Sequence, residues 1–256
     1  MPLPTTKTPK KTALTDQSLL IYGASKIGKS TWCSRADGAL FLATEAGLNH
    51  IEAAQVPCAK WEDILVACGE IAAGGHPYKT IVIDTVDNAY RFCSEYVCAK
   101  NGWANPADGD YGKGFALVNG EFLRVLTKLS LLPYGLILVS HAQDVEIKTR
   151  TGTRNKTMPT LPKKAREIVI GLVDAILYCE ALTVADASGV VTTQRVMHTR
   201  PSEDYEAGSR CGAMPETIPL SYAQFLAAFT AANTQAPTAA MTQTVPGKLT
   251  IITTDT

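Results

Sequence analysis

The stretch GASKIGKS at residues 23–30 constrains the fold of this chain most, because it matches the whole G-x-x-x-x-G-K-[ST] pattern. It follows an apolar run at residues 18–22 and precedes a stretch at residues 31–36 that can form a helix. Glycines at the two fixed positions let successive backbone N–H groups turn inward, and the following helix N-terminus adds partial positive charge. We therefore expect a phosphate-binding loop at a strand-to-helix junction.

Two side chains of this loop have specific expected roles. Lys29 would reach the β- and γ-phosphates of a nucleotide, and the Ser30 hydroxyl would ligate Mg²⁺. A glycine-rich turn with an incidental lysine is the alternative, which the strand-to-helix context disfavours. The sequence thus predicts ATP and Mg²⁺ as ligands, with the nucleotide held by Gly23, Ala24, Ser25, Lys26, Ile27, Gly28, Lys29, Ser30 and Thr31.

Composition limits the remaining classes of protein. A chain of 256 residues has room for one sizeable domain or two small ones, and its zero net charge gives no global attraction for nucleic acid or anionic membrane. Seven cysteines without a C-x-x-C pair indicate buried thiols in a reducing cytosol. With no secretory apolar segment and no apolar run of about 18 residues, we expect a cytoplasmic protein with no membrane partner.

Apolar runs that alternate with helical stretches predict an α/β fold. Continuous runs at residues 81–83 and 136–139 are typical of strands buried on both faces, which indicates a mostly parallel central sheet flanked by helices. Residues 190–198 alternate in polarity after a turn, so we expect a C-terminal antiparallel hairpin. The strands are expected at residues 18–22, 39–43, 80–83, 135–140, 175–179 and 190–198.

The two ends of the chain differ in composition from its middle. Residues 1–16 are rich in Pro, Thr and Lys, and residues 232–256 are poor in aromatic and core residues. We expect a flexible N-terminal arm and a disordered C-terminal tail on either side of a single core at residues 17–231.

A carboxylate ends the apolar strand at residues 80–83. Asp84 occupies the position at which nucleotide hydrolases hold Mg²⁺, usually through water, because this small hard cation keeps much of its hydration shell. The alternative is an aspartate that only caps the next helix. Asp87 is the better candidate for a cap or a supporting residue.

Polar residues follow two further predicted strands. Glu45, after the run at residues 39–43, could orient and deprotonate the attacking water, although a solvated acid is the alternative. His141 follows residues 135–140. In hydrolases with an extra strand between the phosphate-loop strand and the strand that ends in the Mg²⁺-binding aspartate, a polar residue at this position senses the γ-phosphate. A histidine packed at a strand end is the alternative there.

Together, the phosphate loop, Glu45, Asp84 and His141 resemble the RecA-like P-loop NTPase core. The segments ALFLATEAGL (39–48), IVIDTVDN (81–88) and DYGKG (110–114) are similar to phage RecA-like ATPases of the Sak single-strand annealing group. This resemblance covers residues 17–230. It implies ATP-assisted annealing or recombination on single-stranded DNA, a homo-oligomeric ring or filament, and the cytoplasm of a bacterial host, with a single-strand-binding protein as a candidate partner.

A basic stretch at residues 148–166 agrees with a DNA partner. It has seven cations and no acid in a Thr/Gly/Pro-rich sequence typical of a loop. Because it closely follows His141, nucleotide state and DNA binding could be coupled through a short length of chain. A solvated loop or a charged lid over the nucleotide is the alternative. The expected DNA contacts are Lys148, Arg150, Arg154, Lys156, Lys163, Lys164 and Arg166.

Two smaller sets of residues are also candidates. Trp103 and Tyr111 could stack on bases, although such aromatics often pack under a loop. Arg200 and Arg210 could enter the ATP site of a neighbouring subunit, as the resemblance implies, with surface ion pairing as the alternative. The sequence before Arg210 departs from the Lys-Asp-Arg run of the family.

The main prediction is an ATPase, with Glu45 as catalytic base, that acts on single-stranded DNA in phage recombination or annealing. A DNA-binding module in which ATP is an assembly ligand with negligible turnover is the second hypothesis. A small-molecule kinase, in which residues 148–166 form the lid, is the third.

Overall fold

The computed structural model describes residues 3, 5–149, 152–185, 191–211 and 214–234. The strands are β1 (Ser18–Gly23), β2 (Ala39–Ala43), β3 (Ala54–Pro57), β4 (Thr80–Asp84), β5 (Gly135–Thr149), β6 (Gly152–Pro159), β7 (Ala175–Ala185), β8 (Val191–His198), β9 (Gly208–Ser209) and β10 (Thr217–Pro219). The helices are α1 (Lys29–Cys33), α2 (Trp61–Ala73), α3 (Val86–Asn101), α4 (Lys113–Ser130), α5 (Lys163–Leu172) and α6 (Tyr222–Thr234). Short 3-10 turns lie at Leu14–Asp16, Pro106–Asp108 and Asp110–Gly112.

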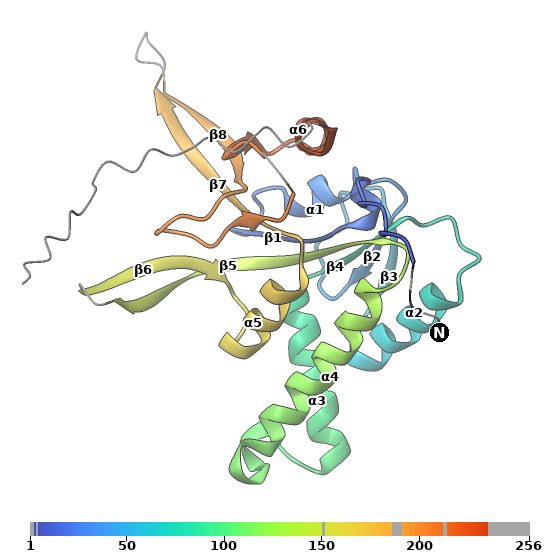
Figure 1. The fold of residues 1–256 in the computed structure, drawn as a ribbon. Helices are drawn as coiled ribbons and strands as arrows, with labels where there is room; N and C mark the ends of the chain where they lie inside the picture. The colour runs from blue at the N-terminus through green and yellow to red at the C-terminus, as the bar shows by residue number, and fades with distance from the viewer. Residues whose placement is uncertain (1–2, 4, 150–151, 186–190, 212–213, 235–256) are drawn as a thin grey trace, which may run out of the picture.

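These strands form one mixed sheet in the order β10-β8-β7-β1-β5-β4-β2-β3, with β6 on β5 and β9 on β7 (Figure 1). The neighbours from β7 to β3 are parallel, whereas β7 and β8 form an antiparallel hairpin. The predicted α/β fold, a mostly parallel sheet flanked by helices with a C-terminal hairpin, is therefore confirmed. Because β5 lies between β1 and β4, the strand ends that bear Gly23, His141 and Asp84 are neighbours.

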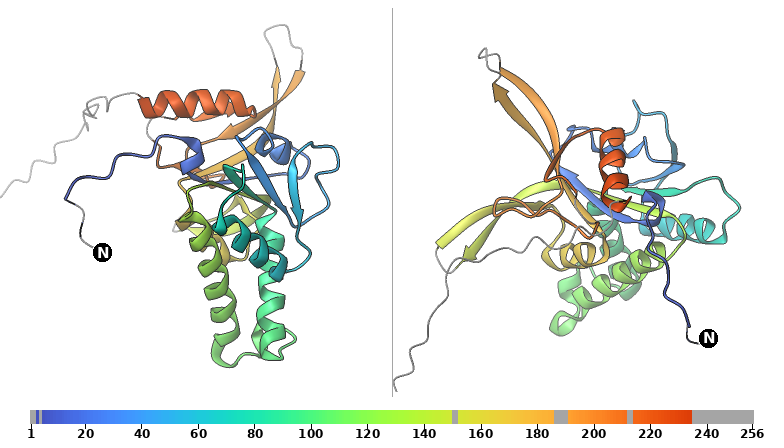
Figure 2. Two further views of the ribbon diagram at one scale, coloured as in Figure 1. Left: turned by 90° about the vertical axis from the view of Figure 1, so that its right-hand side faces the viewer. Right: turned by 45° about the horizontal axis from the view of Figure 1, so that its top comes forward.

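Side chains are buried on both faces of the central parallel strands β1, β4 and β2, where alternate residues point in opposite directions. One cluster joins Leu20 to α2–α5, and the other joins Ile21 to Trp32 of α1 and Phe225 of α6. Figure 2 shows α6 on the opposite side of the sheet from α3 and α4. Of the helices in the described part of the chain, none is both long and apolar enough to cross a bilayer.

The structure corrects the expected loop at residues 148–166. β5 does not end at residue 140 but continues to Thr149, where β6 pairs with it in the register Ala142↔Pro159 to Thr149↔Gly152. The rest of the stretch enters α5. Threonine is common in loops but also favours strands because it is β-branched, so composition alone gave the wrong element.

The expected ends of the core also move. Leu14, assigned to the flexible arm, packs against the buried cluster of Ile21. At the other end, α6 continues to Thr234, so residues 232–234 are helical and Ala232 is buried. The remainder of the predicted tail, residues 235–256, lies outside the described residues.

Tyr22, one residue before the phosphate loop, connects β1 to the base of the β5–β6 hairpin. Its side chain is fully buried, and its hydroxyl donates to the carbonyl oxygens of Glu206 (2.6 Å) and Thr157 (3.1 Å). The same oxygen accepts a hydrogen bond from the Glu206 N–H at 3.0 Å. The strand that carries the loop is thus hydrogen-bonded to β6 and to the segment beyond β8.

Tyr22→Phe should lower the free energy of unfolding by about 1–3 kcal/mol, because the Glu206 carbonyl oxygen loses the hydroxyl that donates to it at 2.6 Å. Tyr78→Phe is the matched control: Tyr78 is half-buried and its hydroxyl has no hydrogen-bond partner among the described residues. The control should change stability by less than about 0.5 kcal/mol in chemical denaturation. Equal losses in the two variants would contradict the role of the Tyr22 hydroxyl.

Candidate nucleotide site

The loop at residues 23–30 joins β1 to α1 at the carboxyl edge of the parallel strands, as predicted. Gly28 has a φ of 114°, in the region that favours glycine. Gly23 lies so close to β7 that an added Cβ would be 2.3 Å from the carbonyl oxygen of Cys179. Gly28 therefore allows the loop to curl, and Gly23 allows it to pack closely against the sheet.

Lys29 is buried inside this loop. Its side chain is at the start of α1, the residue is 5% exposed, and Nζ donates to the carbonyl oxygens of Gly23 and Ala24, each at 2.9 Å. Burial lowers the pKa of Lys29, and the nearby Asp84 and Glu45 carboxylates oppose that shift. A bound phosphate would give the ammonium a charged acceptor in place of two carbonyl dipoles.

Asp84 ends β4 beside the Ser30 hydroxyl. It is 4% exposed; burial raises the pKa of Asp84, while a hydrogen bond with Ser30 lowers it and the charge of Glu45 raises it further. Thr85, and not Asp84, is the N-cap of α3, since its Oγ1 accepts from the Asn88 N–H at 3.5 Å. The Asp84 carboxylate and the Ser30 hydroxyl are neighbouring hard oxygen ligands, a donor set that fits Mg²⁺.

Glu45 and His141 meet above the loop. The distance from Glu45 Oε2 is 3.5 Å to His141 Nε2 and 3.4 Å to Asn88 Nδ2, and His141 Nδ1 lies 3.2 Å from Ser25 Oγ. The imidazole therefore bridges the candidate base and the phosphate loop. One cavity of about 460 Å³, hereafter the phosphate cavity, is lined by Ser25, Lys26, Gly28, Lys29, Ser30, Thr31, Glu45, Ala46, Gly47, Ile51, Asp84 and His141.

Asp87 holds the strand end that carries His141. Its Oδ1 accepts from the Ser140 hydroxyl at 2.8 Å, and its Oδ2 accepts from the His141 N–H at 3.1 Å. Burial raises the pKa of Asp87, and the Ser140 hydrogen bond opposes this. Asp87 is thus a supporting residue, as the sequence suggested, whereas Asn88 beside Glu45 was not singled out because a lone amide in a helix carries no pattern.

The expected DNA contacts have different surroundings. Arg166 is 9% exposed, and its guanidinium donates to the carbonyl oxygens of Pro159 (3.4 Å) and Leu161 (3.5 Å). The expectation that Arg166 holds DNA phosphates is therefore wrong, because this side chain ties β6 to α5 in the interior. A count of charges along the sequence does not distinguish such a buried arginine from an exposed one.

Three other cations of the basic stretch form ion pairs, and two of its described cations form none with a described acid. Arg154 lies 2.6 Å from Glu203, Lys156 2.8 Å from Glu206, and Lys164 3.1 Å from Glu167. Within the described ranges, Lys148 and Lys163 are exposed and form no ion pair. Arg150 lies outside the described residues.

The remaining candidates lie away from the phosphate cavity. The Arg200 guanidinium donates to the Met214 carbonyl oxygen at 3.2 Å. Arg210 lies 3.4 Å from Asp174, which also accepts from the Ser18 N–H at the opposite end of β1 from the loop. Tyr111 is fully exposed in the 3-10 turn Asp110–Gly112, which lies between α3 and α4. Figure 1 shows the segment between these two helices at the far end of the projecting helix pair.

Comparisons with known proteins agree with the fold and the loop. A family model described as an AAA domain matches residues 15–211. A curated relative, the SPbeta prophage-derived uncharacterized protein YorG of Bacillus subtilis (strain 168), is 25% identical over 207 residues. This match covers 78% of the chain and 61% of the relative, so the chain spans less than two thirds of that protein.

Asp84→Asn should raise the melting temperature of the ligand-free protein at neutral pH, because it removes a charge that burial disfavours. The pKa of Asp84 is higher in the folded protein than in the unfolded chain. The contribution of Asp84 to the free energy of unfolding therefore falls as the pH rises from the unfolded-state pKa through the folded-state pKa. The gain of the variant should therefore shrink as pH is lowered.

Asp110→Asn, at an exposed carboxylate with no partner among the described residues, is the control and should leave the melting temperature unchanged. Thermal denaturation at several pH values measures both variants. A lower melting temperature for Asp84→Asn at neutral pH would contradict the assignment of a desolvated carboxylate.

Proposed function

Because the chain belongs to the AAA domain family of P-loop ATPase-type domains, we propose that it binds Mg-ATP, hydrolyses it to ADP and phosphate, and acts on single-stranded DNA. The observation that carries the hydrolytic part is the phosphate cavity. It brings Lys29, Ser30 and Asp84 together with Glu45 and His141. A phosphate-binding set faces a carboxylate and an imidazole there, which is the arrangement that hydrolysis requires.

Each residue has a defined task in this reaction. Glu45 accepts a proton from water as the water oxygen bonds to the γ-phosphorus and the bond to the β–γ bridging oxygen breaks. Lys29 neutralises charge on the phosphate oxygens, and His141 donates a hydrogen bond to the γ-phosphate. Mg²⁺, held through Ser30 and Asp84, would neutralise negative charge on the phosphates. Asn88 keeps Glu45 oriented through its 3.4 Å contact.

The same strand leads from the nucleotide to the candidate DNA-binding surface. β5 carries His141 and continues without interruption to Lys148 in the β5–β6 hairpin. Tyr22 ties the strand of the phosphate loop to β6 through Thr157. A change at His141 on loss of the γ-phosphate would therefore move the hairpin as well, which supports coupling of hydrolysis to DNA binding.

Of the described cations at residues 148–166, Lys148 and Lys163 are exposed and form no ion pair, so they are available to bind DNA phosphates. Arg154, which is half-buried and pairs with the exposed Glu203, adds a third, since ion pairs near the surface contribute only about 0–1 kcal/mol and can exchange a carboxylate for a phosphate. To bind DNA phosphates, Lys156 would have to break its ion pair with Glu206, and Lys164 its ion pair with Glu167.

A phage setting fits the prophage-derived relative, and we extend the proposal to recombination or annealing of the Sak type. The protein would act in the cytoplasm of the bacterial host as a homo-oligomer, with a single-strand-binding protein as a candidate partner. Arg200 or Arg210 would reach a neighbouring ATP site only after releasing Met214 or Asp174.

Glu45→Gln should lower the rate of ATP hydrolysis by roughly 10²–10⁴-fold, because the amide cannot accept the proton of water. ATP affinity should stay within about threefold, since phosphate binding does not use this carboxylate. Glu52→Gln, at an exposed glutamate outside the cavity, is the control and should hydrolyse ATP at the wild-type rate. Hydrolysis by Glu45→Gln at the wild-type rate would contradict Glu45 as base, and full DNA annealing by this variant would favour ATP as an assembly ligand.

Replacing Lys148 and Lys163 together with alanine should weaken binding to single-stranded DNA and flatten its salt dependence. Each phosphate contact contributes about −0.7 to the slope of log K against log salt, so the slope should change by about 1.4. Lys10→Ala combined with Lys128→Ala, two exposed lysines outside the hairpin and α5, is the charge-matched control. Identical slopes for the two double variants would place the DNA path elsewhere.

A further inference from the structure

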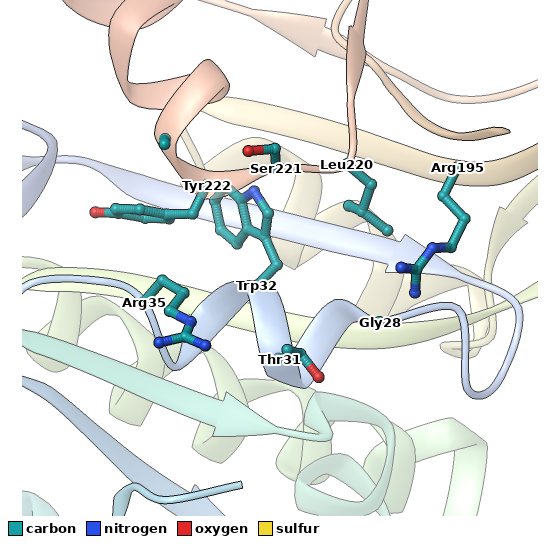
Figure 3. A pocket seen from close by; sticks show the side chains of 9 residues that line it. Gly28, Thr31, Trp32, Arg35, Arg195, Leu220, Ser221 and Tyr222 are labelled. Atoms are coloured by element: carbon teal, nitrogen blue, oxygen red, sulfur yellow. The ribbon is translucent and has the colours of Figure 1, made fainter.

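A second cavity, of about 420 Å³, opens beside the phosphate cavity (Figure 3). It lies between α1 and the residues that lead from β10 into α6, and we name it the α1–α6 cavity. Gly28 and Thr31 line both cavities, so they meet at the loop and the first turn of α1. A group attached to phosphates on the loop therefore has a direct path into the α1–α6 cavity.

We propose that the α1–α6 cavity holds the nucleoside of the bound triphosphate, an inference that rests on the proposed binding of nucleotide at the loop. Its volume falls within the range of about 300–1,000 Å³ found for small-molecule sites. None of the described residues that line it is acidic, so the cavity does not repel an anionic ligand. The sequence motif placed the phosphates only and gave no residue for the base.

One end of the cavity suits a planar ring. Figure 3 shows Arg35 and Tyr222 on the same side of it, one from the turn that follows α1 and one from the start of α6. Arg35 is exposed, and its guanidinium has no partner in the described part of the chain. A guanidinium plane and a phenol ring both stack on nucleobases, so these two side chains would hold the base.

The wall between α1 and α6 is rigid. Trp32 is buried and meets the ring of Tyr222 at 5.1 Å and that of Phe225 at 5.2 Å, both edge to face. Its indole nitrogen, directed toward Ser221 in Figure 3, has no hydrogen-bond partner among the described residues. A preformed wall of this kind orders few side chains when a ligand binds, which lowers the cost of binding.

The other end of the cavity is positive and lies beside the loop. Arg195 of β8 reaches Gly28, where its Nη1 donates to the Ile27 carbonyl oxygen at 3.2 Å. It forms no ion pair with a described acid. Its charge therefore faces the junction of the two cavities, where the ribose and the first phosphate would lie. The cavity is therefore cationic at the end near the phosphates, where Arg195 lies, and has stacking side chains at the distal end, where Arg35 and Tyr222 lie. A nucleotide has its charge and its planar base in the same order.

Two alanines of α6 allow a matched test. Ala223 lines the cavity, whereas Ala227 is exposed one turn further along and does not. Ala223→Trp would fill the cavity without removing a buried side chain, and Ala227→Trp carries the same bulk elsewhere. Calorimetric titration with Mg-ATP and with magnesium tripolyphosphate, which has the phosphates and no nucleoside, separates the two cavities.

Ala223→Trp should weaken Mg-ATP binding at least tenfold and leave tripolyphosphate affinity within about twofold, while Ala227→Trp changes neither. Arg35→Ala should show the same selective loss to a smaller extent. Wild-type ATP affinity in Ala223→Trp would overturn the nucleoside site and leave nucleotide binding at the loop standing. An equal loss of both ligands in Ala223→Trp and Arg35→Ala would also overturn it, and a wild-type chain that binds neither ligand would overturn both proposals.

Discussion

The buried ammonium of Lys29 is the interaction on which the rest of the site depends. A charge at 5% exposure is costly unless it is paired or hydrogen-bonded, and here two loop carbonyl oxygens at 2.9 Å serve as acceptors. Asp84 and Glu45 add favourable electrostatic interactions. The ammonium therefore holds the loop in shape through two neutral carbonyl acceptors. A triphosphate can replace these acceptors with negatively charged oxygens, and that exchange supplies binding free energy.

The sheet determines what surrounds this charge. With β5 inserted between β1 and β4, the loop, His141 and Asp84 share one edge, and Asp87 fixes the end of β5 through Ser140 and the His141 N–H. β5 then leaves the sheet as one strand of the projecting hairpin. The same strand thus carries His141 at the nucleotide site and Lys148 at the candidate DNA surface. A shift of β5 is the physical basis of the proposed coupling.

Local patterns predicted much of the fold and the centre of the site. The motif gave the phosphate loop, and the apolar run at residues 39–43 gave β2 with its observed bounds, because these signals lie within a few residues of one another. The β5–β6 hairpin was missed because its pairing is set by partners across the turn and its threonines also suit a loop. Arg166 was misassigned because burial is a property of the packed fold, and Arg195 was missed because its contact with Ile27 spans 168 residues of sequence.

The role of Lys29 can be measured by titrating the purified chain and its Lys29→Met variant with ATP in the presence of Mg²⁺. The wild-type chain should bind, and the variant should lose roughly 10- to 100-fold in affinity, because hydrogen bonds to a charged group contribute about 1.5–3 kcal/mol. A wild-type chain with no measurable affinity for any nucleoside triphosphate, or a variant that binds as tightly as the wild type, would contradict that role.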